Sequence, residues 1–543
     1  MENQTTRRRS LSRTLVAPAG VLLAMLAASV LPTGHGGLHL ALAAAFWVAL
    51  LFTIAELDRS ILTARWLLPL ALAYFATFAW HRHVLAIPDY VFNTDTERYL
   101  REAAAHRIQV RHLGFPVITF AAKALGREAV IAQCAAAGAL LVSAFDALQA
   151  RFGARGIGRA AMTVIFAASL ATWTMASLIE SFVLSTLLLA LALSAMAAWT
   201  ERPETPGAIR LGLLILASLG VSLENAYLVP VIVAGALTMG RIPAPRNLAL
   251  VVALPVAGLA LWIPAVAASQ GEGFYATWGD ESFSAPAGNV VENLEHFSRD
   301  YVAPGRLLTP RSHVETLWRT FVLSVRGLSG EDSSRYPAVL HRAMFLDAGN
   351  VACAVLTAAL ATLSLVTLFR RARVEPRALR VLLTACAATL ILRHVFLVVY
   401  APTQSLLFSL PSLFSLDLTV AWGLARAEPR RVRHLALGAA VTLAALVAIS
   451  NARVLVELQR DAPREAASGS SAPPPTANTR SAPGGRLAAH AFVRRSIGSI
   501  SGSSVSWIAP QCIGTIAWAP SATKASRACS GFMWCGSMNH AGA

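Results

Sequence analysis

Two carboxylates flank a threonine at the start of an amphipathic stretch, in the sequence Asp95-Thr96-Glu97. A carboxylate of this kind accepts a proton from an attacking hydroxyl group, or binds a divalent cation such as Mg²⁺ or Mn²⁺ that holds a phosphate leaving group. The same residues also suit a helix start, because Thr94 and Glu97 have the spacing of a capping box. That alternative accounts for Glu97 better than for Asp95. We therefore expect Asp95 to be a catalytic carboxylate, with Glu97 beside it.

A basic pair and a chain corner follow this acidic motif. Arg111 and His112 precede the sequence Gly114-Phe115-Pro116, whose glycine and proline favour a sharp turn. Arginine binds a phosphate bidentately and histidine moves a proton, so the pair suits a site that receives an anionic headgroup. The alternative is a pair of cations whose side chains simply reach the membrane interface. We expect the short apolar stretch 113–125 to be re-entrant or interfacial.

Three further ionisable residues lie in or beside long apolar runs. Glu180 and Glu224 each occupy a very short connection between two runs, and Arg393 lies about two helical turns inside another. Ionisable groups are costly in hydrocarbon and usually mark a pathway, a pair or a site. The alternatives are a turn residue for each glutamate and a structural ion pair for Arg393. We predict that these three residues bind substrate together with Arg111 and His112.

These residues belong to a chain that is too apolar for one soluble core. Of its 543 residues, 55% are hydrophobic and 14% are charged, and the mean hydropathy is +0.56, whereas soluble proteins contain about 25% charged residues. The apolar runs have the length that crosses a bilayer. We predict an all-α, polytopic transmembrane bundle of about thirteen spans, which excludes an ordinary water-soluble enzyme. The expected spans are 15–32, 38–55, 66–82, 129–148, 160–178, 181–199, 208–223, 226–239, 247–268, 347–369, 379–399, 404–425 and 434–451.

The arginines indicate how the bundle is oriented. Lysine provides only two of the 46 Lys and Arg residues, and many arginines gather in alternate short loops, while the short connections 33–37, 180, 224–225 and 401–403 contain no Lys or Arg. By the positive-inside rule, the N-terminus is cytoplasmic and the C-terminal tail is outside. The net charge of +17 forms no single patch, so nucleic acid is not an expected partner. The arginine-rich usage suggests a GC-rich genome and therefore a bacterial inner membrane.

Composition shifts divide the chain into five parts. We expect an N-terminal arm with two extra membrane helices (1–65), a membrane module that contains the acidic first outer loop at 81–112 (66–268), a second outer loop (269–346), C-terminal membrane helices (347–459) and a low-complexity tail without order (460–543). No Walker-type, HExxH or GxSxG motif occurs, so an activated group would have to arrive on a lipid. Cys134, Cys353 and Cys386 lie in apolar runs, where a thiol packs as a small hydrophobe.

The motifs together resemble the GT-C superfamily of membrane glycosyltransferases, which includes protein O-mannosyltransferases and bacterial aminoarabinose transferases. The resemblance covers roughly residues 66–425 and rests on Asp95-Thr96-Glu97, on His112 with Pro116, and on Glu180. It implies a polyprenyl-phosphate-linked sugar as donor, an inverting transfer and a catalytic carboxylate that maps onto Asp95. The acidic loop follows the third span here, whereas in the family it usually follows the first.

From position, Arg111 or Arg393 would contact the donor phosphate, and the loop 269–346 would cover the acceptor. The leading hypothesis is therefore transfer of a sugar from a polyprenyl phosphate to an envelope lipid, glycan or protein. One alternative is a transporter or flippase for a lipid-linked or anionic substrate, with Glu180, Glu224 and Arg393 along a polar pathway. Another is a noncatalytic scaffold that retains an enzyme-like fold. Long outer loops favour the transferase, because carriers place their sites near the bilayer midplane.

Overall fold

The computed structural model describes residues 2–31, 36–81, 96–238, 244–276, 285–286, 302–326, 347–400 and 408–469. Asp95 lies outside these residues, and so does the side chain of Glu97. The chain divides into a unit spanning residues 1–471 and a second unit, 472–543, which lies wholly outside the described residues. The fold that follows is that of the first unit.

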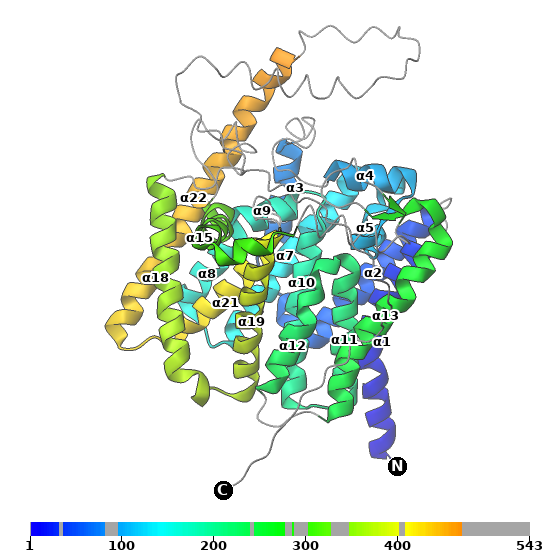
Figure 1. Cartoon of the computed structure of the whole chain (residues 1–543), viewed down its shortest axis with the longest axis horizontal. Coiled ribbons are helices and arrows are strands. Elements are labelled where there is room, and N and C mark those ends of the chain that lie inside the picture. The colour runs from blue at the N-terminus through cyan, green and yellow to red at the C-terminus, as the bar shows by residue number, and fades with distance from the viewer. Residues whose placement is uncertain are drawn as a thin grey trace, which may run out of the picture. The chain divides into compact units, whose positions relative to one another are not determined.

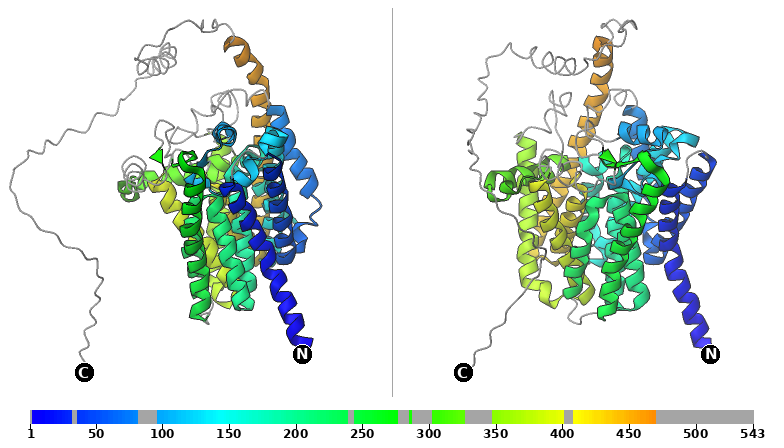
Figure 2. Two further views of the ribbon diagram at one scale, coloured as in Figure 1. Left: turned by 90° about the vertical axis from the view of Figure 1, so that its right-hand side faces the viewer. Right: turned by 45° about the vertical axis from the view of Figure 1, so that its right-hand side comes forward.

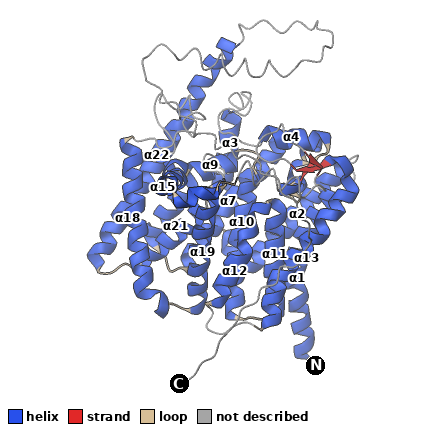
Figure 3. Ribbon diagram, in the orientation of Figure 1, coloured by secondary structure: helices blue, strands red, loops and turns tan. Residues whose placement is uncertain are grey.

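Helices make up nearly all of the described chain, as the apolar runs predicted (Figures 1 and 3). Inside a bilayer a helix satisfies every backbone hydrogen bond within itself, and these alanine- and leucine-rich runs favour that state. The α-helices are α1 (Glu2–Val30), α2 (Gly36–Leu57), α3 (Leu67–His81), α4 (Thr96–Ala105), α5 (Pro116–Thr119), α6 (Ala122–Leu125), α7 (Arg127–Arg151), α8 (Gly156–Ala168), α9 (Leu170–Ser177), α10 (Ser181–Glu201), α11 (Thr205–Val221), α12 (Leu228–Leu237), α13 (Pro245–Gln270), α15 (Pro310–Trp318), α16 (Ser324–Arg326), α18 (Ala348–Arg371), α19 (Arg377–Val399), α21 (Leu410–Arg426) and α22 (Arg430–Gly469).

Short helical turns and strands connect these helices. A π-helical turn, η7 (Arg319–Leu323), joins α15 to α16. The strands β1 (Ile108–Gln109), β2 (Phe274–Ala276) and β3 (Ala285–Pro286) form one small sheet, drawn in red in Figure 3. The 3₁₀ turns are η1 (Arg59–Ile61), η3 (Val110–His112), η4 (Leu223–Tyr227), η5 (Gly271–Gly273), η6 (Pro304–Leu308) and η9 (Ala372–Val374).

Seven of the described helices are long and apolar enough to cross a membrane, namely α2, α7, α10, α13, α18, α19 and α22. The number becomes eight if α8 and α9, which are bent by 54° at their junction, count as one span. The prediction of a helical protein with membrane-spanning segments is thus confirmed in this coarser form. Helices also overlap the other expected spans, but their apolar parts are shorter, and the total of thirteen crossings stays a prediction.

The burial of each helix shows which ones form the centre of the bundle. In α10, 94% of the most hydrophobic window is buried, against 22% in α13 and in α18. Helix α10 packs against α7, α11 and α19, while α1 and α2 pack together at one edge (Figures 1 and 2). Large apolar side chains on the peripheral helices remain exposed, among them Leu261 and Phe369. Such a surface suits contact with lipid, and Cys134, Cys353 and Cys386 are buried as expected.

One predicted boundary is placed differently by the structure. Helix α22 continues to Gly469, so the tail that was predicted to be without order from residue 460 starts at least ten residues later. Residues 460–469 contain Arg460, Arg464, Glu465 and three alanines, which favour a helix whatever their polarity. The stretch 113–125 forms two helices of four residues each, α5 and α6, which are too short to span a bilayer. Whether this stretch is re-entrant or interfacial stays a prediction.

Candidate functional site

A cluster of polar residues forms where α11 ends, and we call it the outer cluster after the side on which the arginine pattern predicts it to lie. It comprises Tyr99, Arg111, His112, Glu180, Ser181, Glu224, Asn225, Tyr227 and Arg393. The last carbonyl groups of a helix have no partner within it. Here the backbone N–H of Gly114 donates to the carbonyl of Gly220 at 2.7 Å, and His112 Nδ1 lies 3.0 Å from the carbonyl of Val221. The end of α11 therefore holds the basic pair in place.

His112 is buried and neutral. Its Nδ1 faces a carbonyl, which can only accept, so Nδ1 carries the proton and Nε2 is left as an acceptor for the Tyr99 hydroxyl 3.2 Å away. The Tyr99 oxygen also lies 3.3 Å from Ser181 Oγ. Burial, followed by the charges of Arg111 and Arg98, lowers the pKa of His112 well below its usual value of about 6.5. Because all three side chains are at most 2% exposed, they form a rigid frame rather than a surface for substrate.

Arg111 and Glu224 form an ion pair across elements that lie 113 residues apart in the sequence. Arg111 Nη2 donates to Glu224 Oε1, and the two side chains are 8% and 10% exposed. Asn225 fixes the turn that carries Glu224, since its amide donates to Ser185 Oγ at 2.6 Å and to the Ser218 carbonyl at 3.0 Å. The Arg111 charge is therefore largely compensated inside the protein.

Arg393 is 2% exposed and lies among aromatic rings. Its guanidinium carbon is 5.0 Å from the ring centre of Phe396 and 5.2 Å from that of Tyr227, and its Nη2 donates to the Phe408 carbonyl. Glu224 is close enough to interact electrostatically with both Arg393 and Tyr227. This arrangement stabilises a cation within an otherwise apolar helix.

Three buried polar atoms, one of them on Arg393 itself, have no hydrogen-bond partner among the residues that the structure describes. They are Glu224 Oε2, the Tyr227 hydroxyl and Arg393 Nε. Buried polar atoms are nearly always paired, because leaving one unpaired costs about 1–3 kcal/mol. The carboxylate oxygen of Glu224 can accept a hydrogen bond, the Tyr227 hydroxyl can donate and accept one, and Arg393 Nε can donate one. A ligand that carries hydroxyl and phosphate oxygens has the groups that would satisfy them.

Glu180 is fully buried at the start of α10. Its neighbours in sequence tie this start to α4, since Thr96 Oγ1 donates to the carbonyl of Ile179 at 3.3 Å and Ser181 contacts Tyr99. Thr96 directly follows Asp95 in the chain and begins α4. Thr94, the predicted capping residue, lies outside the described residues.

Four of the five predicted substrate-binding residues are linked at the outer cluster, although they come from separate parts of the sequence. Arg111 and Glu224 contact each other, Arg393 interacts with Glu224, and His112 is next to Arg111. Glu180 adjoins Ser181 in the chain, and its side chain interacts with Cys134. The predicted catalytic Asp95 and the Glu97 side chain lie outside the described residues. Within the described ranges no three His, Cys, Asp or Glu side chains are placed to hold a metal ion. A divalent cation at Asp95 stays a prediction.

Four members of the outer cluster were not singled out from the sequence: Tyr99, Ser181, Asn225 and Tyr227. A signal for Tyr99 does exist, since Thr96, Tyr99 and Ala103 follow the helical spacing and all lie on the buried face of α4. Asn225 and Tyr227 follow Glu224 within one short turn, which marks that whole turn as polar. Ser181 gave no signal, because serine is common at helix starts.

Comparison with known proteins adds no assignment. No protein-family model matches this chain, and no curated protein matches it.

Proposed function

We propose that this protein is a membrane glycosyltransferase of the GT-C type that moves a sugar from a polyprenyl phosphate to an envelope acceptor. In this proposal the chain crosses a bacterial inner membrane thirteen times, with its N-terminus in the cytoplasm and its tail outside. The alternation of arginine-rich loops supports that orientation. The outer cluster then faces the side on which polyprenyl-linked sugars are used.

The observation that carries the proposal is the set of three unpartnered polar atoms, Glu224 Oε2, Tyr227 OH and Arg393 Nε. A sugar phosphate offers hydroxyl donors to the carboxylate and phosphate oxygens to the guanidinium group. Arg393 also presents a fixed positive charge in an apolar setting, where its attraction for a phosphate is stronger than in water. Arg111 is the weaker candidate for the phosphate, because Glu224 already compensates its charge.

The proposed reaction needs one general base and one stabilised leaving group. Asp95 removes the proton from an acceptor hydroxyl, the acceptor oxygen forms a bond to the sugar C1, and the bond from C1 to the phosphate oxygen breaks. The electron pair stays on the polyprenyl phosphate, whose added negative charge is stabilised by Arg393. The proton ends on Asp95, and the configuration at C1 inverts. His112, Tyr99 and Ser181 are positioning residues in this scheme.

The test compares envelope glycans and lipids by mass spectrometry in cells that lack the protein and in the same cells complemented with wild type, Asp95→Asn or Arg393→Gln. We expect one sugar to disappear on deletion and wild type alone to restore it. The matched control is Glu204→Gln, because Glu204 is exposed and caps no backbone group at the start of α11. All variants are compared at equal membrane abundance.

Restoration of the sugar by Asp95→Asn would exclude Asp95 as the base. A transporter or flippase predicts a different result, namely accumulation of an unmodified lipid-linked sugar on the inner side and loss of activity when the proton gradient is collapsed. An unchanged envelope after deletion would contradict the transferase proposal.

A further inference from the structure

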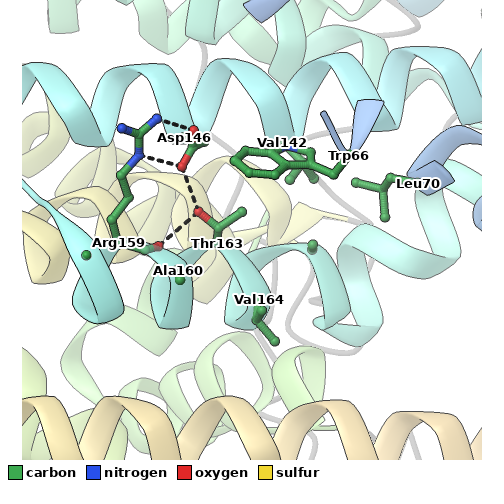
Figure 4. A pocket seen from close by; sticks show the side chains of 10 residues that line it. Trp66, Leu70, Val142, Asp146, Arg159, Ala160, Thr163 and Val164 are labelled. Carbon is green, nitrogen blue, oxygen red and sulfur yellow. Dashed lines mark hydrogen bonds and ion pairs between the residues drawn. The ribbon is translucent and has the colours of Figure 1, made fainter. Parts of the chain in front are cut away.

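A groove of about 480 Å³ lies between the start of α3, the second half of α7 and α8. Its volume is typical of small-molecule and lipid sites. The walls are mostly apolar and include Trp66, Leu70, Val142 and Val164 (Figure 4). Small residues keep it open, because α8 presents Gly156 and Ala160 to the groove one turn apart.

The groove lies at the end of the bundle opposite the outer cluster. Two ion pairs identify this end, since Asp58 after α2 binds Arg151 at the end of α7 and Glu56 binds Arg210 near the start of α11. The outer cluster lies where α11 ends, and the 17 residues of α11 extend over about 25 Å. The two sites thus belong to different faces of a membrane.

One end of the groove is polar. Arg159 Nε donates to Asp146 Oδ1 at 2.6 Å, Arg159 Nη2 donates to Asp146 Oδ2, and the Thr163 hydroxyl donates to the same carboxylate at 3.1 Å (Figure 4). Asp146 is thereby saturated. The third guanidinium nitrogen, Arg159 Nη1, makes no hydrogen bond to another described residue, and the side chain is 33% exposed. The two N–H groups of Nη1 can therefore donate to a ligand or to solvent.

The rim of the groove carries an excess of positive charge. Arg65 precedes the groove residue Trp66, and Arg155 precedes Gly156; both arginines are exposed, and neither forms an ion pair with another residue in the described ranges. Two carboxylates near this end, Asp58 and Glu56, are already paired with other arginines. Two cations therefore remain uncompensated beside an apolar groove.

We propose that this groove binds an anionic phospholipid. One acyl chain lies along Trp66, Leu70 and Val164, and the phosphate is bound by Arg65, Arg155 and Arg159 Nη1. Cationic pockets between membrane helices bind anionic headgroups on the cytoplasmic side, where such lipids and a tryptophan at the interface are both favoured. The site is independent of the proposed sugar transfer, since it shares no residue with the outer cluster.

The test is native mass spectrometry of the purified full chain, with phosphatidylglycerol and phosphatidylcholine of the same acyl chains offered in turn. Each exposed arginine near a bilayer contributes about fivefold to the binding of an anionic lipid. Because Arg159 is paired with Asp146, only Arg65 and Arg155 count toward this effect. Together they should make wild type retain phosphatidylglycerol roughly thirtyfold better than phosphatidylcholine. The double variant Arg65→Gln/Arg155→Gln should lose this preference, and Ala160→Phe, which fills the groove, should lose retained lipid of both kinds.

Two controls keep the test specific. Arg370→Gln/Arg373→Gln removes the same charge from exposed positions on α18 and η9, and Ala359→Phe adds the same ring to the exposed surface of α18. Both should behave as wild type. Equal retention of the two lipids by wild type would show ordinary lipid contact only. If the Arg370/Arg373 control lost the preference for phosphatidylglycerol as much as the Arg65/Arg155 variant does, the preference would come from the overall positive charge and not from the groove. Either result would overturn the proposal.

Discussion

Glu224→Gln should destabilise the protein strongly. The substitution removes the negative charge that faces Arg111, and the Arg111 side chain is only 8% exposed. Loss of one partner from a buried ion pair costs about 3–5 kcal/mol, because the remaining charge stays buried after it has lost that counter-charge. Arg393 also interacts with Glu224, so two cations lose the same counter-charge. We therefore expect a loss in the upper half of that range.

The assay is equilibrium unfolding in mixed micelles, followed by the helical circular dichroism signal. The informative comparison is the double variant Arg111→Met/Glu224→Leu, which removes both charges and fills their space with apolar groups. Replacing a buried pair in this way is often nearly neutral, so the double variant should recover at least half of the lost free energy of unfolding. Glu204→Gln, at an exposed position, should change the free energy by less than about 0.5 kcal/mol.

A loss below about 1 kcal/mol for Glu224→Gln would refute the reasoning, because that value is typical of an exposed pair. The same conclusion would follow if the double variant were less stable than both single variants, since the pair would then stabilise the fold by more than its burial costs.

Three further predictions concern other contacts. The free energy of unfolding of wild type should fall by up to about 1.4 kcal/mol per pH unit as the pH drops below about 6.5, because the unfolded chain protonates His112 while the folded chain holds it neutral. His112→Gln should flatten this slope. Equal pH slopes for wild type and variant, measured by urea or detergent titration, would contradict the prediction. Gly220→Ala should cost about 1–3 kcal/mol in the same titration, because its Cβ would lie 2.6 Å from two ring carbons of Trp262, whereas Gly438→Ala, with open space around it, should be neutral or slightly stabilising. Arg159→Lys should lower the free energy of unfolding by about 1–2 kcal/mol, because lysine cannot reproduce the two parallel hydrogen bonds to Asp146. A thermal unfolding midpoint equal to that of wild type would contradict this prediction.

The sequence predicted the positions of the helices well, because bilayer thickness imposes a length on each apolar run. It also identified Arg111, His112, Glu180, Glu224 and Arg393 one at a time, since an ionisable residue in an apolar run is conspicuous. What it did not provide was their pairing. The contact between Arg111 and Glu224 joins residues 113 positions apart and depends on how α11 packs, which no local pattern records.

Misplaced boundaries have a different physical origin. The start of the low-complexity tail was inferred from a shift to polar composition, but polarity and helix propensity are separate properties. Arginine, glutamate and alanine after residue 460 are polar or small and still favour a helix, so α22 extends beyond its apolar part. The phospholipid groove likewise escaped the sequence, because Trp66 and Gly156 lie 90 positions apart and only the packing of α3 on α7 and α8 brings them together.

The ties that hold the outer cluster also determine when it can form during synthesis. Strand β1 pairs in parallel with β2, so that Ile108 lies opposite Phe274. His112 binds the carbonyl of Val221, and Gly114 binds that of Gly220. A ribosome that has made α4 to α10 has therefore exposed Arg111 without Glu224, and the cluster stays open until residues up to 274 have emerged. Arg393 arrives later still. Membrane insertion of the early helices therefore precedes formation of the ion pair between Arg111 and Glu224, and a chain arrested before α11 would lack the contact that joins η3 to η4.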